Sequence, residues 1–155
     1  MFRLPYNKFQ KVLEIVTIAL ILCEIVYVAI RYSRIGDKIP KNFDLAGNPD
    51  AWGSKATIFI LLAVTIGLYI LMTVCVFFPK MWNVPVKVTE QNKGIITKYV
   101  INMVLLDKFL IVACFFYILV CSMEGIALGL WFTIFMLVSI LGVTFYYTIK
   151  LFFVK

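Results

Sequence analysis

The sequence predicts an all-α membrane protein, a bundle of four transmembrane helices with both termini in the cytoplasm (N-in/C-in). Four long apolar stretches support this fold class, at residues 12–30, 56–78, 100–122 and 126–149. Each approaches the ~20 residues with which a helix crosses ~30 Å of hydrocarbon. Hydrophobic residues make up 63% of the 155 residues, whereas a soluble domain has about 45–50% apolar residues. We therefore expect one integral membrane domain over residues 1–155, surrounded by the lipid bilayer.

The first apolar stretch follows basic residues, as the apolar region of a cleaved signal peptide would. It is longer than such a region, and Glu14 and Glu24 interrupt it, so we interpret it as a retained span. Orientation then follows from the basic residues, which should be more numerous in the cytoplasm. Nine lie in segments expected inside and five in segments expected outside: Arg3, Lys8, Lys11, Lys80, Lys87, Lys93, Lys98, Lys150 and Lys155 against Arg31, Arg34, Lys38, Lys41 and Lys55.

Composition also excludes several kinds of site. The net charge of +7 is spread around the ends of the spans, which favours anionic lipid headgroups over nucleic acid as its partner. The four cysteines all lie inside spans, where we expect burial and no disulfide. The chain has no histidine and no CxxC pair. We therefore expect no cofactor and no zinc or haem site.

The connection after the first span, residues 31–55, is expected outside and carries strong turn signals. Ile39-Pro40 favours extended backbone, and Gly47-Asn48-Pro49-Asp50 is typical of a turn. Asp50 or Ser54 is suited to cap the second span, and Trp52 to lie among the outer headgroups. We expect an ordered loop packed on the outer ends of the helices.

The later connections indicate how the remaining spans are arranged. In residues 79–99, two prolines break helix formation, and Thr89 is suited to cap a third helix that begins in the cytoplasm. Only Met123–Gly125 separates the third and fourth spans, so these should be antiparallel neighbours. The small-residue pairs Gly125/Gly129 and Ala63/Gly67 leave oligomerisation open.

Glu24 lies near the middle of the first span. A carboxylate at that depth costs about 2.5–3.5 kcal/mol on insertion scales. Protonation would avoid most of that cost, and so would pairing with Arg31, Lys38 or a tyrosine hydroxyl. Glu24 is then either a proton- or ligand-sensing group or, as we favour, a hydrogen-bonded residue that pins one helix to another.

Asp107 and Lys108 interrupt the third span near its expected cytoplasmic end. Adjacent residues do not share a helix face, so we expect Lys108 to extend toward the headgroups and Asp107 to face inward, toward Asn102, Glu14 or Lys11. An interfacial charge pair that fixes helix depth is the favoured interpretation. The alternative is a proton relay through Asp107, Glu14 and Glu24.

No catalytic motif is found: HExxH, GxSxG and a Gly-rich phosphate loop are all missing from the sequence. We therefore do not expect an enzyme. Asp44, Asn48 and Asp50 are spaced like part of a calcium loop, but the bidentate glutamate of such a loop does not follow, so turn formation is the favoured interpretation and no metal site is expected.

Two segments resemble the motifs of a bacterial family of uncharacterised membrane domains, which also forms the N-terminal part of SdpI-type immunity proteins. Residues 37–50 read DKIPKNFDLAGNPD, followed by WGSK at 52–55. Residues 82–92, WNVPVKVTEQN, are similar to the second motif, N-x-P-V-x-x-T-x-x-N, through Asn83, Pro85, Thr89 and Asn92. The chain departs from the family at Asn42, usually histidine, and at Asp44, usually asparagine, and residues 1–155 do not include the second multi-span domain of SdpI-type proteins.

The resemblance implies a non-enzymatic, multi-pass protein of the bacterial cytoplasmic membrane that protects against a peptide toxin or senses a signal. The exposed connection would bind the peptide or a membrane-protein partner, through Asn42, Asp44, Asn48, Asp50, Trp52 and Lys55. The alternative is a small proton-coupled transporter or channel-like subunit that uses Glu24 and Asp107. A purely structural partner of a larger membrane complex is a third hypothesis.

Overall fold

The computed structural model describes residues 6–154 and is mostly helical. Four helices are long and apolar enough to cross a membrane. This confirms a long apolar helix at each of the four predicted stretches and fits a multi-pass membrane protein. They are α1 (Lys8–Arg31), α2 (Thr57–Phe77), α3 (Lys93–Glu124) and α4 (Leu130–Phe152), with a short 3-10 helix, η1 (Pro79–Met81), after α2. Arg3 and Lys155, two of the residues used to predict the orientation, lie outside the described residues.

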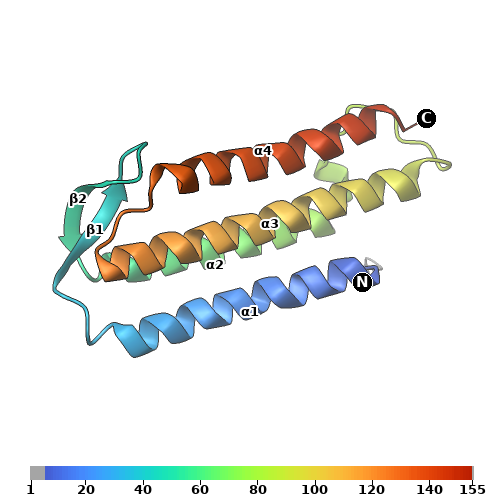
Figure 1. The fold of residues 1–155 in the computed structure, drawn as a ribbon. Coiled ribbons are helices and arrows are strands. Elements are labelled where there is room, and N and C mark those ends of the chain that lie inside the picture. Colours follow the sequence, from blue (N-terminus) through green and yellow to red (C-terminus); the bar gives the residue numbers. More distant parts are fainter. Residues whose placement is uncertain (1–5, 155) are drawn as a thin grey trace.

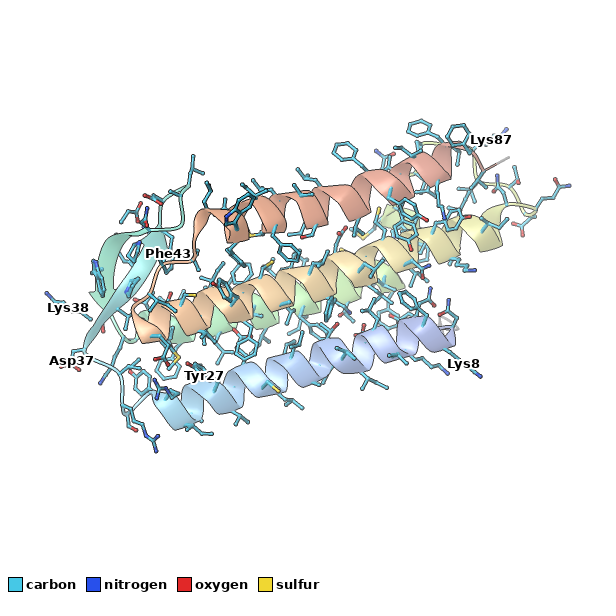
Figure 2. All side chains as sticks on the ribbon, viewed as in Figure 1. Lys8, Tyr27, Asp37, Lys38, Phe43 and Lys87 are labelled. Carbon is cyan, nitrogen blue, oxygen red and sulfur yellow. The ribbon has the colours of Figure 1, made fainter. Side chains whose placement is uncertain are left out.

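The four helices run along a common axis in alternating directions, and α3 is the central one (Figure 1). Helices α1, α2 and α4 each pack mainly on α3, with fewer contacts between α1 and α2. One end of the bundle, which we call the hairpin end, carries the connection between α1 and α2. The other, the terminal end, carries both termini and the connection between α2 and α3. Figure 2 shows Lys38 and Phe43 at the hairpin end, and Lys8 and Lys87 at the terminal end.

The connection between α1 and α2 forms two antiparallel strands, β1 (Lys38–Phe43) and β2 (Pro49–Ser54). The sequence predicted an ordered loop but not strands, so the all-α prediction is wrong for this segment. Extended backbone at Ile39-Pro40 and the turn after Phe43 are the local causes. A two-stranded hairpin is marginal alone, and here it gains stability by packing on α3.

Local signals explain where α1 begins and where α3 ends. Asn7 and Gln10 form a capping box at the start of α1, each side chain accepting from the other's backbone N–H at 2.9 Å. The third helix begins before its apolar stretch, as predicted. It ends at Glu124 and is capped by Gly125, whose φ is +69°; Gly129, at the start of α4, has φ of +82°. The connection to α4 therefore covers residues 125–129 and is longer than Met123–Gly125.

The core follows α3 from one end of the bundle to the other in three clusters. Near the hairpin, Leu119 and Met123 pack with Val28, Ile39 and Ile58. Nearer the terminal end, Ile101 and Leu105 pack with Val76, and Ile96 and Val100 pack with Leu151. Leu151 is the only buried residue of α4, all of which is described. The outer surfaces of α1, α2 and α4 are instead exposed and apolar, as lipid contact would require.

The cysteines follow the same division between core and surface. All four are free thiols within helices; Cys114 and Cys121 are buried, whereas Cys23 and Cys75 are exposed. The predicted burial is therefore wrong for the latter two, because the sequence places them in spans but does not reveal which way each helix face points.

Candidate functional site

The hairpin is held on the bundle by its first strand. The side chain of Ile39 is 3% exposed and lies in the core cluster at the hairpin end, and Pro40 beside it is buried as well. Ile39 packs there against Ile58 of α2 and Leu119 of α3. The hairpin is therefore anchored by apolar burial at its base.

A second anchor lies at the turn. The backbone N–H of Leu128, in the connection between α3 and α4, donates to the carbonyl oxygen of Gly47 at 2.7 Å. Gly47 has φ of +81°, and a Cβ atom there would lie 2.5 Å from the backbone nitrogen of Gly129. Only glycine fits both the conformation and the approach. The two connections at this end therefore form one surface.

The turn itself is closed by Asp44. The backbone N–H of Asn48 donates to its carboxylate at 2.8 Å, and the N–H of Gly47 donates to its carbonyl oxygen at 2.9 Å. Sequence reasoning placed the turn at residues 47–50, but the structure centres it on 44–47, and Pro49 opens β2. The Asp44 side chain explains the difference, since aspartate readily bonds the backbone of a following turn.

Five of the six predicted hairpin residues are exposed: Asn42, Asp44, Asn48, Asp50 and Trp52. The sixth, Lys55, instead holds the base of the hairpin. Its ammonium group pairs with Asp37 at 3.1 Å and lies 5.4 Å from the centre of the Tyr32 ring. Asp50 does not cap α2, whose start has no side-chain cap, although the Ser54 hydroxyl accepts from the N–H of Ala56 at 3.3 Å.

Within the bundle, Lys108 joins three helices. Its ammonium group donates to both carboxylate oxygens of Glu14 on α1, at 2.7 and 2.8 Å, and to the hydroxyl of Thr73 on α2 at 3.0 Å. The hydroxyl of Tyr69 donates to the same carboxylate at 2.6 Å, and its ring lies 4.5 Å from the ammonium group. A charged pair is thereby enclosed where α1, α2 and α3 meet.

This arrangement corrects the prediction for Lys108. The side chain does not extend toward the headgroups; it is 1% exposed. The physical reason is that Glu14 neutralises the ammonium charge and that carboxylate and hydroxyl oxygens accept its N–H groups, so burial no longer leaves an isolated charge. Sequence reasoning did not identify the pair, but the occurrence of opposite charges in the first and third spans was a usable signal.

Glu24 is fully buried between α1 and α2. The hydroxyl of Thr65 lies 3.2 Å from one carboxyl oxygen, and it also lies 3.1 Å from the carbonyl oxygen of Leu61. Because a threonine hydroxyl has one hydrogen, these two acceptors share it. The other carboxyl oxygen has no hydrogen-bond partner among residues 6–154. The alternative of a pair with Arg31, Lys38 or a tyrosine is therefore wrong. The bond from Thr65 of α2 supports the favoured interpretation of a residue that links two helices, although Glu24 is incompletely satisfied.

Asp107 lies on the opposite side of α3, against α4. It accepts from the hydroxyl of Thr144 at 2.9 Å, and its second carboxylate oxygen is buried with no partner in the described chain. Asp107 is buried, as predicted, but the partners predicted for it are wrong. Its expected neighbours Asn102, Glu14 and Lys11 are not its partners, because Asn102 accepts instead from Gln10 at 2.8 Å and Glu14 pairs with Lys108.

At the hairpin end, Arg31 and Glu124 connect the last turns of α1 and α3. Arg31 donates to both oxygens of Glu124 at 2.5 and 2.7 Å, and the Tyr27 hydroxyl donates to the first at 2.6 Å. This ion pair is about one-third exposed, which fits a polar interface at the end of the bundle. In the sequence, only the opposite charges at two span ends indicate this pair.

The residues of the second motif occupy two different places. Asn92 is buried and bonds Thr89 in both directions: its side chain accepts from the Thr89 N–H at 2.8 Å, and the Thr89 hydroxyl accepts from its N–H at 3.3 Å. Thr89 thus closes a turn just before α3 rather than forming its N-cap, which is Asn92. Asn83 and Pro85 are exposed and line a cavity of about 340 Å³ against α3 and α4.

Comparison with known proteins connects one part of this description to a family. Neither a curated protein nor a solved structure matches the chain. A family model described as a domain of unknown function (DUF1648) matches residues 19–66. The match runs from the middle of α1 through the hairpin into α2, so it includes Glu24, Thr65 and all six predicted hairpin residues. Over that segment, the chain is similar to a domain of unknown function.

Proposed function

We propose that this chain is a non-enzymatic, multi-pass protein of the bacterial cytoplasmic membrane, and that its hairpin binds a secreted peptide outside the cell, as an immunity or signal-sensing module. The supporting observation is a polar surface held in one conformation. Burial of Ile39, the bond from Leu128 to Gly47, and the turn closed by Asp44 fix the hairpin backbone. A fixed backbone lowers the entropy that binding must overcome.

The side chains on this surface suit peptide recognition. Asn42, Asn48, Asp44 and Asp50 offer amide and carboxylate groups, and Trp52 is 54% exposed beside the connection between α3 and α4. Tryptophan is enriched among the residues that contribute most to binding, and here it lies on a hairpin that also carries exposed polar side chains. Hydrogen-bonding groups around an aromatic ring would bind both the backbone and one apolar side chain of a peptide.

The proposed orientation rests on the distribution of charge. Of the described basic residues, those at the terminal end are more numerous than those at the hairpin end, and Figure 2 shows Lys8 and Lys87 at the former. The end with more lysine and arginine faces the cytoplasm in most membrane proteins. The hairpin would then face the exterior, where a secreted peptide is accessible.

Trp52→Ala and Asp50→Ala test the proposal in bacteria that express the chain and are challenged with a panel of secreted peptide toxins. We expect both variants to lose protection while their amount in the membrane fraction is unchanged, because both side chains are exposed. Lys11→Gln, an exposed position at the other end of the bundle, is the matched control and should protect fully. Full protection by both hairpin variants, or none by the unmodified chain, would contradict the proposal.

Proton-coupled transport is a second candidate, favoured by one observation. Glu24 and Asp107 each keep a buried carboxyl oxygen that has no partner within residues 6–154, and such groups in spans commonly serve proton transfer. They lie on opposite sides of α3, which argues against a single path. Proton flux in protein-loaded liposomes that Glu24→Gln abolishes would support transport, and flux equal to that of empty liposomes would reject it.

A further inference from the structure

The terminal end of the bundle contains two adjacent cavities that no part of the hairpin proposal uses. The first, of about 340 Å³, lies between α3, α4 and the connection after η1, and is lined mainly by apolar side chains such as Val100, Met103 and Leu151. The second, of about 280 Å³, lies beside η1 and the start of α3. Trp82 and Val84 line both cavities, so the two are adjacent.

The two cavities differ in charge. The first includes only Asn83 and Thr148 as polar side chains in its lining, whereas the second has Lys80 and Lys93 in its wall. Lys93 has a partner in Glu90, but the two charged atoms are 3.6 Å apart and both side chains are largely exposed, a geometry that binds weakly. The segment over residues 79–98, which includes the first turns of α3, carries four lysines and one glutamate, so the charge around the second cavity is positive.

The position of the cavities along the bundle suggests where a ligand would come from. Gln10 bonds Asn102 at 2.8 Å, so the part of α3 that lines the first cavity is level with the beginning of α1. Leu151 is in the last turn of α4. The apolar cavity thus lies where the apolar stretches end, and the lysines lie just beyond it. A phospholipid has the same order of groups at the surface of a bilayer.

We propose that this end of the bundle binds one anionic phospholipid, with part of an acyl chain in the cavity lined by Val100 and Leu151 and the phosphate between Lys80 and Lys93. Charge complementarity and the apolar lining select this occupant, and the combined size suits it, since small-molecule sites usually measure about 300–1,000 Å³. Trp82 marks the boundary between the acyl chain and the lipid headgroup. Its ring is held in place there because its indole N–H donates to the carbonyl oxygen of Cys75 at 2.8 Å.

This inference rests on the membrane insertion proposed above, and the test separates the two. Trp52→Phe and Trp131→Phe leave Trp82 as the single tryptophan. The protein is reconstituted in phosphatidylcholine vesicles that contain an equal fraction of brominated phosphatidylglycerol or brominated phosphatidylcholine, and quenching of Trp82 fluorescence is measured. We expect a preference for the anionic lipid of about fivefold for each lysine that contacts the phosphate.

Two variants locate the site. Lys80→Gln with Lys93→Gln should reduce quenching by phosphatidylglycerol to that by phosphatidylcholine, whereas Lys38→Gln with Lys41→Gln, at the hairpin end, should change nothing. Thr148→Phe should fill the apolar cavity and lower the preference while both lysines remain. Equal quenching by the two lipids, or a preference that survives loss of Lys80 and Lys93, would overturn the lipid site alone. No quenching by either lipid would contradict membrane insertion itself.

Discussion

Lys108 shows how a full charge is held among apolar helices. Its ammonium group is surrounded by the two oxygens of Glu14, the hydroxyl of Thr73 and the ring of Tyr69, and these come from two other helices. Breaking a buried ion pair on one side leaves the remaining charge without compensation, which is more harmful than losing both charges together. The pair therefore fixes how α1, α2 and α3 are rotated against one another.

Lys108→Met is expected to destabilise the protein by about 3–5 kcal/mol, because it leaves the Glu14 carboxylate buried without its counter-charge. The measurement is thermal unfolding in detergent followed by circular dichroism. Adding Glu14→Gln to the same protein should restore most of the lost stability. Lys98→Met, an exposed position on the same helix, is the control and should have little effect. Equal losses in the single and double variants would show that the charges are not coupled.

At the scale of elements, the hairpin and α4 depend on the helix α3 in different ways. The hairpin is fixed by buried apolar side chains and by close backbone contact with the connection between α3 and α4. Helix α4 buries little of its own surface, and the hydrogen bond from Thr144 to Asp107 joins it to the middle of α3. The hairpin should therefore respond to changes in backbone fit, and α4 to the loss of single polar contacts.

Gly47→Ala should loosen the hairpin. An L-residue at this positive φ costs about 1–2 kcal/mol, and the added Cβ would also collide with Gly129. Hydrogen exchange measured by mass spectrometry should show faster exchange in peptides that cover the hairpin and Leu128. Gly36→Ala is the matched control, since its Cβ would meet only one atom, at 3.9 Å. Unchanged exchange in both variants would mean that the close approach does not hold the hairpin.

Thr144→Val should weaken the attachment of α4. It removes the hydroxyl that donates to Asp107 and leaves a buried carboxyl without that bond, which costs about 1–3 kcal/mol. We expect faster hydrogen exchange across residues 130–152 and little change in α1. Thr133→Val, on the same helix but without a side-chain hydrogen bond to Asp107, provides the comparison. Similar exchange in the two variants would remove Asp107 from the attachment of α4.

At the scale of the whole molecule, the sequence predicted the four long helices well because the length of an apolar stretch is enough to locate each of them. It predicted the hairpin only as an ordered loop, because strands this short are stabilised by packing on α3 rather than by their own pattern. The partners predicted for Lys108 and Asp107 were wrong. Adjacent residues point about 100° apart on a helix, and the sequence does not reveal which neighbouring helix lies in either direction. The exposed residues of the hairpin followed directly from turn chemistry and polarity.

The central claim is that the four helices cross a membrane and hold the hairpin outside the cytoplasm. Labelling of single cysteines with a membrane-impermeant maleimide in intact cells tests it most directly. Cys23, Cys75, Cys114 and Cys121 are first replaced by alanine, and Leu45→Cys in the hairpin, where the side chain is 85% exposed, or Lys87→Cys at the terminal end is then added. We predict that Cys introduced at 45 is labelled in intact cells and that Cys introduced at 87 reacts only after permeabilisation. Labelling of position 87 but not 45 in intact cells, or recovery of the protein in the soluble fraction, would contradict the account.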